Sequence, residues 1–192
     1  MHRGQGIRTD AGGVMDLLSG RIAVYPGTFD PLTFGHVSLT RRACGIFDTV
    51  VFAIAEETGK DTLFSAEERL EMAKEVFYDR PNVHVSTFSG LTVNFARKCG
   101  SIVLLRGLRA VSDFDYELQL ALLNRKLDPG VETMFLMTDA RWLFISSSSI
   151  KSAARLNGNI QGMVPESVRK RLMEKYGYPF VPAETTSDDE KA

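Results

Sequence analysis

Five short runs of apolar and β-branched residues alternate with helical segments along this 192-residue chain. The clearest run is 49–55, Thr-Val-Val-Phe-Ala-Ile-Ala, which lacks the apolar-polar alternation of a half-exposed strand and so predicts a strand buried on both faces. The other expected strands are 22–25, 83–87, 102–105 and 132–137. Strands that alternate with helices predict a parallel sheet covered by helices on both faces. We therefore expect an α/β fold, a single doubly wound Rossmann-like domain with a five-stranded parallel sheet.

Apolar residues at helical spacing mark the helices between and after these runs. The sequence Ser-Ala-Glu-Glu at 65–68 matches a capping box, Asp-Pro-Gly at 128–130 ends the helix 113–127, and Pro165 begins the last helix. The positions assigned to one face of each helix are Leu39, Ala43, Ile46 and Phe47; Leu70, Ala73, Val76 and Phe77; Phe114, Leu118, Ala121 and Leu122; Ile150, Ala153 and Ala154; and Val168, Leu172 and Met173.

Composition restricts the class of protein. With 44% hydrophobic and 24% charged residues the chain has an ordinary globular composition, and its net charge of −1 gives no basic footprint for nucleic acid. No run of 18 apolar residues predicts a membrane span. Cys44 and Cys99 do not form a C-x-x-C pair, which argues against structural zinc or a disulfide framework and favours a reducing, cytoplasmic location.

The two ends differ from the middle of the chain. Residues 1–20 are rich in glycine and charge, lack the apolar core of a signal peptide and are expected to form a mobile extension. Residues 181–192 end in a polar, charged sequence that predicts a disordered tail. The folded domain is thus expected to span residues 21–180.

The first strand leads through a tight loop into a helix, an arrangement that favours an anion. The helix N-terminus presents unpaired N–H groups and the positive end of its dipole. Gly27 and Gly35 allow close approach of the backbone, Thr28 and Thr33 offer hydroxyls, and His36 adds a ring donor. Taken by itself, His36 could equally cap its helix or pack on a neighbour.

Two further groups of polar residues lie where a parallel sheet binds ligands, at the carboxyl ends of its strands. Arg106 and Arg109 follow the expected strand 102–105, and a run of serines at 146–149 precedes a helix. The arginines could belong to a solvated loop and the serines to a flexible one, but at a helix N-terminus the serines would form a second phosphate cradle. No Walker A, Gly-x-Gly-x-x-Gly, His/Cys cluster or serine nucleophile elbow is present.

Four ordered motifs resemble a known family. Gly-Thr-Phe-Asp-Pro at 27–31 followed by Thr-Phe-Gly-His at 33–36 is similar to the signature of the nucleotidyltransferase superfamily. The stretches 105–111 (Leu-Arg-Gly-Leu-Arg-Ala-Val), 113–117 (Asp-Phe-Asp-Tyr-Glu) and 142–148 (Trp-Leu-Phe-Ile-Ser-Ser-Ser) resemble its bacterial phosphopantetheine adenylyltransferase branch. Together these motifs cover residues 21–176 in the order of the family.

The resemblance implies transfer of the adenylyl group of ATP to 4′-phosphopantetheine, which gives dephospho-coenzyme A and pyrophosphate. It implies Mg²⁺ on the nucleotide phosphates, coenzyme A as a feedback ligand and a homohexamer. By resemblance the catalytic residues are His36, Lys60 and Arg106, and the acceptor is bound by Thr28, Lys60, Thr92 and Arg106. The ATP-binding residues are Thr28, Phe29, His36, Gly107, Leu108, Arg109, Glu117, Trp142, Leu143, Phe144, Ile145, Ser146, Ser147 and Ser148. No dedicated protein ligands for a metal are expected.

Three alternatives remain at this point. A sibling nucleotidyltransferase acting on glycerol 3-phosphate or nicotinamide mononucleotide would share the motif at 27–36. A nucleotide-binding sensor would keep the cradle without catalysis. A class I aminoacyl-tRNA synthetase also carries a Gly-His element, but 192 residues leave no room for an anticodon domain.

Overall fold

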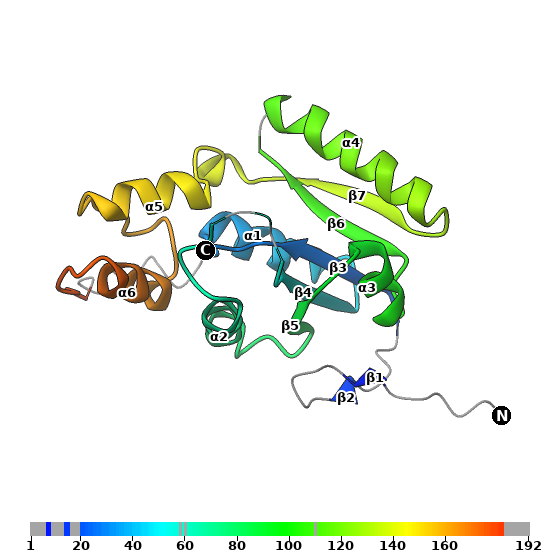
Figure 1. Cartoon of the computed structure of the whole chain (residues 1–192), viewed down its shortest axis with the longest axis horizontal. Coiled ribbons are helices and arrows are strands. Elements are labelled where there is room, and N and C mark those ends of the chain that lie inside the picture. Colours follow the sequence, from blue (N-terminus) through cyan, green and yellow to red (C-terminus); the bar gives the residue numbers. More distant parts are fainter. Residues whose placement is uncertain are drawn as a thin grey trace.

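The centre of the fold is a sheet of five parallel strands (Figure 1). We describe it from a computed structural model, which describes residues 7–8, 14–15, 20–57, 59, 61–109 and 111–182, with the side chains of 7–8, 14–15 and 111–112 excepted. The strands are β3 (Ile22–Gly27), β4 (Thr49–Ala55), β5 (Val83–Phe88), β6 (Val103–Leu108) and β7 (Glu132–Met137). This arrangement confirms the expected α/β fold with a five-stranded parallel sheet.

The order of the strands creates a ligand-binding position. The sheet runs β5-β4-β3-β6-β7, so the chain builds outward from β3 on one side and then returns to build outward on the other. The carboxyl ends of β3 and β6 therefore lie at the point where the strand order reverses. Crevices at such points are the usual ligand sites of open parallel sheets.

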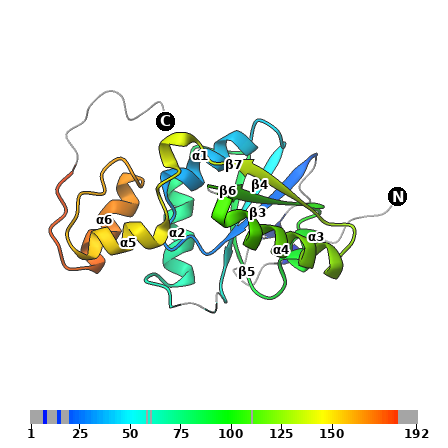
Figure 2. The ribbon, with the colours of Figure 1, turned by 90° about the horizontal axis from the view of Figure 1, so that it is seen from above.

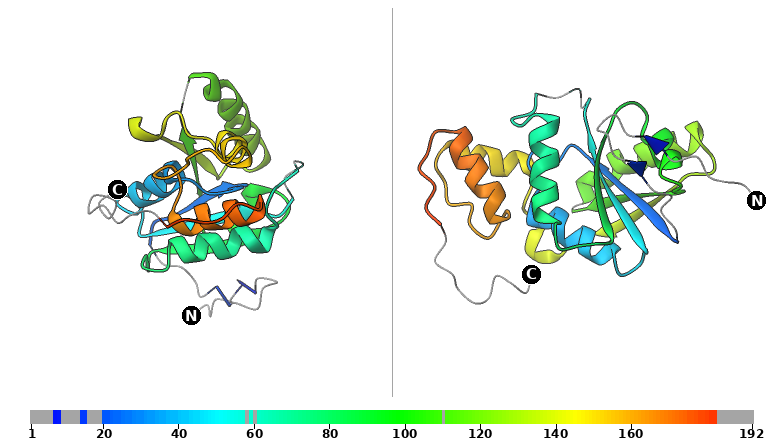
Figure 3. Two further views of the ribbon diagram at one scale, coloured as in Figure 1. Left: turned by 90° about the vertical axis from the view of Figure 1, so that its left-hand side faces the viewer. Right: turned by 90° about the horizontal axis from the view of Figure 1, so that it is seen from below.

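Helices cover both faces of the sheet (Figures 1 and 2). They are α1 (Phe34–Ala43), α2 (Ala66–Val76), α3 (Thr92–Lys98), α4 (Val111–Leu127), a 3₁₀ turn η1 (Ala140–Trp142), α5 (Ser147–Arg155) and α6 (Glu166–Lys175). Figure 3 shows α6 beside α2 at the end of the sheet that α5 also flanks. Two additional strands, β1 (Ile7–Arg8) and β2 (Val14–Met15), pair antiparallel and were not expected from the sequence.

Side-chain alternation along the strands divides the core into two clusters. Tyr25 and Phe52 face the side covered by α1 and α2, where the cluster continues to α5 and α6. Val24 and Val51 face the side where α3 packs. The central strand β4 is buried from Thr49 to Ile54, as its composition predicted. The capping box at Ser65 also forms as expected, since Ser65 and Glu68 each accept from the other's backbone N–H.

Three local expectations are corrected by the structure. The strand β6 continues to Leu108, so Arg106 and Gly107 lie within the strand instead of after it. Ile46 is 39% exposed because α1 ends at Ala43 and the helical spacing does not extend to it. The apolar positions of α4, among them Phe114 and Leu122, are exposed instead of packed on the sheet.

The expected mobile extension and disordered tail lie mostly outside the described residues. None of the helices in the described part of the chain has the length and apolar character that a membrane span requires.

Candidate active site

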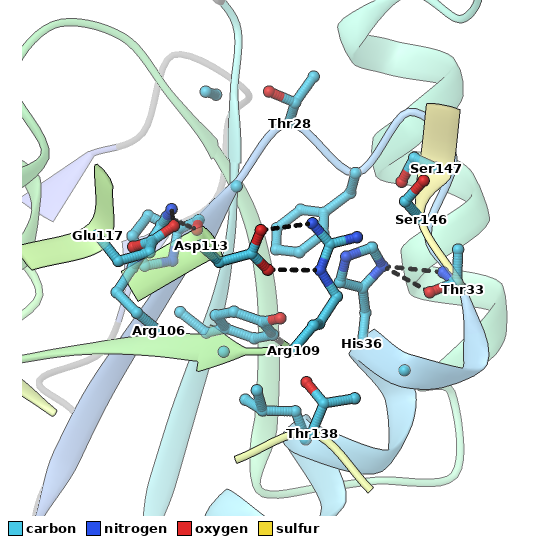
Figure 4. A pocket seen from close by; sticks show the side chains of 18 of the residues that line it. Thr28, Thr33, His36, Arg106, Arg109, Asp113, Glu117, Thr138, Ser146 and Ser147 are labelled. Atoms are coloured by element: carbon cyan, nitrogen blue, oxygen red, sulfur yellow. Dashed lines mark hydrogen bonds and ion pairs between the residues drawn. The ribbon is translucent and has the colours of Figure 1, made fainter. Parts of the chain in front are cut away.

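A cavity of about 620 Å³ opens at the carboxyl ends of β3 and β6. Its wall combines the loop after β3, the first turn of α1, the end of β6, the first turns of α4 and the N-terminus of α5 (Figure 4). Segments far apart in the sequence thus meet at one site, and its volume is in the range of small-molecule sites.

The first turn of α1 fixes the orientation of His36. The Nδ1 atom of His36 accepts a hydrogen bond of 2.9 Å from the backbone N–H of Thr33, the N-cap residue of α1. Because Nδ1 is an acceptor, the proton of the neutral ring resides on Nε2. His36 therefore offers one N–H donor to a ligand in the cavity.

The charge state of His36 supports that assignment. Burial and, to a smaller extent, the positive charges of Arg109 and Arg106 together lower its pKa to about 4. The imidazole is consequently neutral at pH 7. In the free protein His36 can act as a hydrogen-bond donor but not as a positive charge.

Aromatic rings pack against the imidazole ring of His36. Phe29 stacks on Phe52 with ring centroids 3.9 Å apart and meets His36 edge-on at 5.1 Å. Phe29 has a φ of 51°, a left-handed backbone conformation that is uncommon for an aromatic residue. The residue as a whole is 5% exposed, so Phe29 offers little surface to a ligand.

Arg106 projects from β6 into the cavity and is held by Glu117 of α4. Its Nε and Nη2 donate to the two carboxylate oxygens of Glu117 at 2.7 and 2.6 Å, and Nη1 donates to the carbonyl of Pro26 at 2.9 Å. A guanidinium has five N–H groups, so these contacts leave one on Nη1 and one on Nη2. Two adjacent N–H donors of this kind match a phosphate.

Arg109 is held in the same way by Asp113, which lies one turn before Glu117 on α4. Its Nε donates to Asp113 at 3.0 Å, and its Nη1 lies 3.4 Å from the carbonyl of Ile145. Asp113 and Glu117 are four residues apart and thus lie on one face of the helix. This face of α4 orients both arginines of the cavity (Figure 4).

Gly107 lies between the two arginines on β6. A Cβ atom at this position would lie 2.6 Å from Cδ1 of Leu39, so any larger residue would force the buried Leu39 side chain to move.

The serine run forms the N-terminus of α5. Ser146 is the N-cap: its Oγ accepts from the N–H of Ser149, and the Oγ of Ser149 accepts from the N–H of Ser146, both at 3.0 Å. The Oγ of Ser147 donates to the carbonyl of Pro31 at 2.7 Å. Helix geometry leaves the N–H groups of Ser147 and Ser148 without a backbone acceptor, so this end of α5 can receive an anion.

Most of the expected site residues line this one cavity. The structure places these residues on its wall: Thr28, Phe29, Thr92, His36, Arg106, Gly107, Arg109, Glu117, Trp142, Ile145, Ser146, Ser147 and Ser148. Leu108, Leu143 and Phe144 are not among the lining residues, and Leu143 and Phe144 are exposed. Lys60 lies outside the described residues, although Glu57 of the same loop lines the cavity.

Trp142 has two side-chain neighbours at its ring. The ring of Phe34 stacks at 5.4 Å, and the Arg141 guanidinium lies 5.5 Å from the ring centroid. The Trp142 ring is thus partly covered by residues of the protein itself.

The sequence did not identify several residues that shape the site. Asp113 was missed as a partner, although its i, i+4 spacing from Arg109 indicates a pair. Arg69 was also missed. It is 2% exposed and falls on the apolar face of α2 at helical spacing from Met72 and Ala73, which is the sequence sign of its burial.

The described residues contain no group of three or more His, Cys, Asp or Glu side chains that could hold a metal ion. Two carboxylates of the cavity, Asp113 and Glu117, are already paired with arginines. This donor set fits a cation carried by a ligand's own phosphates better than one held by the protein.

The fold and the site define a class of protein. A family model described as cytidylyltransferase-like matches residues 24–153. A solved Vibrio parahaemolyticus protein, assigned as a nicotinate-nucleotide adenylyltransferase, superposes with a TM-score of 0.60 over 81% of this chain and 99% of that one, at 17% identity. At this identity the likeness shows the fold alone. The family match makes the chain a nucleotidyltransferase.

Relatives of higher sequence identity show which family within this class the chain belongs to. The phosphopantetheine adenylyltransferase of Nitratidesulfovibrio vulgaris (strain DP4) is 60% identical over 166 residues, 86% of this chain and 89% of the relative. The enzyme of that name from Oleidesulfovibrio alaskensis is 55% identical over 86% of this chain and 98% of the relative, and that from Moorella thermoacetica is 51% identical over 82% and 99%. The chain belongs to the phosphopantetheine adenylyltransferase family.

Proposed function

We propose that this chain transfers the adenylyl group of ATP to 4′-phosphopantetheine, forming dephospho-coenzyme A and pyrophosphate. The single observation that carries the proposal is one cavity whose wall brings together His36, Arg106 and the N-terminus of α5, groups that can each donate to an anion. The names of the relatives supply the substrates.

The reaction needs no covalent intermediate. A phosphate oxygen of the acceptor attacks the α-phosphorus of ATP, a new P–O bond forms in line with the bond that breaks, and pyrophosphate leaves. The protein's contribution is to hold two anions in contact and to stabilise the charge of the transition state.

Each group of residues in the cavity has its own role in this mechanism. The neutral His36 donates from Nε2 to the α-phosphate, and Thr28 lies at the junction of the two substrates. The two free N–H groups of Arg106 bind the acceptor phosphate, with Lys60 as a second cation and Thr92 beside the pantetheine arm. Arg109 and the turn 146–148 bind the ATP phosphates.

Glu117 and Asp113 have an electrostatic part in this proposal. A carboxylate beside a polyphosphate is unfavourable, but each of these is paired with an arginine in the free protein. The pairs hold the arginines in place before the anions arrive, which reduces the reorganisation needed in the transition state.

Mg²⁺ would be held by the nucleotide phosphates and would neutralise part of their charge. The pairing of Asp113 and Glu117 with arginines supports this proposal over a dedicated protein site.

Two further parts of the proposal concern regulation and assembly. Coenzyme A carries the same pantetheine arm and an adenine nucleotide, so the cavity fits it as a feedback ligand. The exposed apolar residues of α4, including Phe114, Leu118 and Leu122, support association of copies of this chain into a homohexamer.

A cytoplasmic location is supported by Cys44 and Cys99, which are both free thiols.

The test is pyrophosphate release from ATP and Mg²⁺ with one acceptor at a time: 4′-phosphopantetheine, glycerol 3-phosphate or nicotinamide mononucleotide. Release with 4′-phosphopantetheine alone is expected. Release with another acceptor alone would assign a sibling activity, and ATP binding without release from any acceptor would favour a sensor.

A further inference from the structure

Behind the cavity wall lies a buried carboxylate that no part of the mechanism uses. Asp30 is 4% exposed and is not among the residues that line the cavity. One oxygen accepts from the N–H of Phe64 and the other from the N–H of Leu63, both at 2.9 Å. The ammonium of Lys151 on α5 forms an ion pair with the same carboxylate.

These contacts join two different parts of the site. Leu63 and Phe64 end the loop that carries Glu57 and Lys60. Lys151 lies one turn after Ser147 on α5, so both side chains occupy one face of the helix. Ser147 adds a second contact by donating to the carbonyl of the residue after Asp30.

A second buried charge completes the arrangement. The Nη1 of Arg69 donates to the carbonyls of Thr28 at 2.7 Å and Ala55 at 2.9 Å, and its Nε lies 3.2 Å from the carbonyl of Phe64. Arg69 is close enough to Asp30 for the carboxylate to stabilise its positive charge. The loop after β3 is therefore fastened to α5 on one side and to the start of α2 on the other.

We propose that Asp30 is a positioning residue that couples the two substrate subsites. It links the serine turn of α5, which faces the nucleotide phosphates, to the loop 56–64, which faces the acceptor phosphate. Because Asp30 contacts both segments, a change that one substrate makes in its own subsite is passed on to the other subsite. The assignment of the two substrates to the two subsites rests on the proposed function.

The link through Lys151 can be cut without removing a residue of the cavity. In the full chain, isothermal titration calorimetry would measure the affinity for α,β-methylene-ATP alone and with saturating 4′-phosphopantetheine, and for the acceptor in the same two ways. The ratio of affinities gives a coupling factor that must be the same in both directions. We expect a coupling factor of about fivefold or more in the unchanged protein, which is the lower end of the range typical of coupled binding sites.

In Lys151→Met we expect the coupling factor to fall to about twofold or less, because the ion pair to Asp30 is lost and only the hydrogen bond from Ser147 to Pro31 still ties α5 to the loop. The affinity for each substrate alone should stay within about threefold, because Lys151 does not line the cavity. Lys151→Arg keeps the positive charge and should restore the coupling. Arg155→Met is the matched control, since Arg155 is an exposed basic residue one turn after Lys151 that does not contact Asp30, and this variant should keep the coupling.

Asp30→Asn is a second, independent variant that keeps the shape but removes the charge, and it should lose coupling as Lys151→Met does. A coupling factor of one in the unchanged protein, or an unchanged factor in Lys151→Met, would overturn the proposal. Failure of the unchanged protein to bind 4′-phosphopantetheine at all would instead refute the proposed function and, with it, the assignment of the subsites.

Discussion

Replacement of His36 by alanine should slow adenylyl transfer by about 10²-fold, equivalent to about 3 kcal/mol of transition-state stabilisation. Removal of one preorganised donor from an anionic transition state costs 10²–10³-fold. We expect the lower end because the pKa of His36 is about 4, so the substitution removes a neutral donor and not a charge. The measurement is single-turnover pyrophosphate formation at saturating ATP and 4′-phosphopantetheine, near pH 7.5.

The same substitution has a smaller effect on stability. The backbone N–H of Thr33 loses its acceptor at Nδ1, which costs about 1 kcal/mol as for other lost helix caps and lowers the Tm by about 2–4 °C. Thr33→Val removes the Oγ1 that lies 3.2 Å from Nδ1 but keeps the N–H donor and the ring, so it should slow turnover much less than His36→Ala does. A His36→Ala protein that is folded by circular dichroism and turns over at nearly the normal rate would refute the assigned role.

Four other predictions concern Arg106, the charge state of His36, the pH dependence of stability and the association of copies of the chain. Arg106→Ala should raise the KM for 4′-phosphopantetheine in steady-state assays by tenfold or more, since a charged hydrogen bond contributes about 1.5–3 kcal/mol; a change confined to the KM for ATP would contradict it. In an NMR titration the His36 ring should remain in the Nε2–H form down to a pKa of about 4, and a midpoint near 6.5 would contradict this. Because the unfolded chain binds that proton first, the free energy of unfolding should fall as the pH drops from about 6.5 to about 4 in denaturant titrations of the normal protein, and less so in His36→Ala. Leu122→Glu, on the exposed apolar side of α4, should reduce the molar mass measured by light scattering, and an unchanged mass would exclude this side as an interface.

The sequence predicted the parts of the fold that follow from local patterns. The strand 49–55 was predicted with its observed bounds because a two-face-buried strand has a composition unlike that of any surface segment. The start of α2 at the capping box of Ser65 was also predicted, since the side chains that form the box lie three residues apart in the sequence. The predicted end of this strand at residue 105 was wrong because Arg106 and Gly107 are not typical strand residues. They belong to β6 because they pair with Phe135 and Leu136 of β7.

The candidate site was predictable in its residues but not in its internal contacts. Glu117 was assigned to ATP by resemblance, whereas the structure also pairs it with Arg106. The pairing of Asp30 with Lys151 spans 121 positions and leaves no periodic sign in the sequence. Long-range contacts of this kind depend on the complete fold, so only the structure shows which charges in the site are already compensated.

Direct in-line transfer between two substrates held in one cavity is the central claim, and the stereochemistry at the transferred phosphorus tests it most directly. The enzyme would be given one diastereomer of adenosine 5′-O-(1-thiotriphosphate) with 4′-phosphopantetheine, and the configuration of the thio-product would be determined by phosphorus NMR. A single in-line displacement predicts inversion. Retention would show that a residue of the protein carries the adenylyl group in an intermediate, and it would contradict the mechanism derived from His36, Arg106 and the N-terminus of α5.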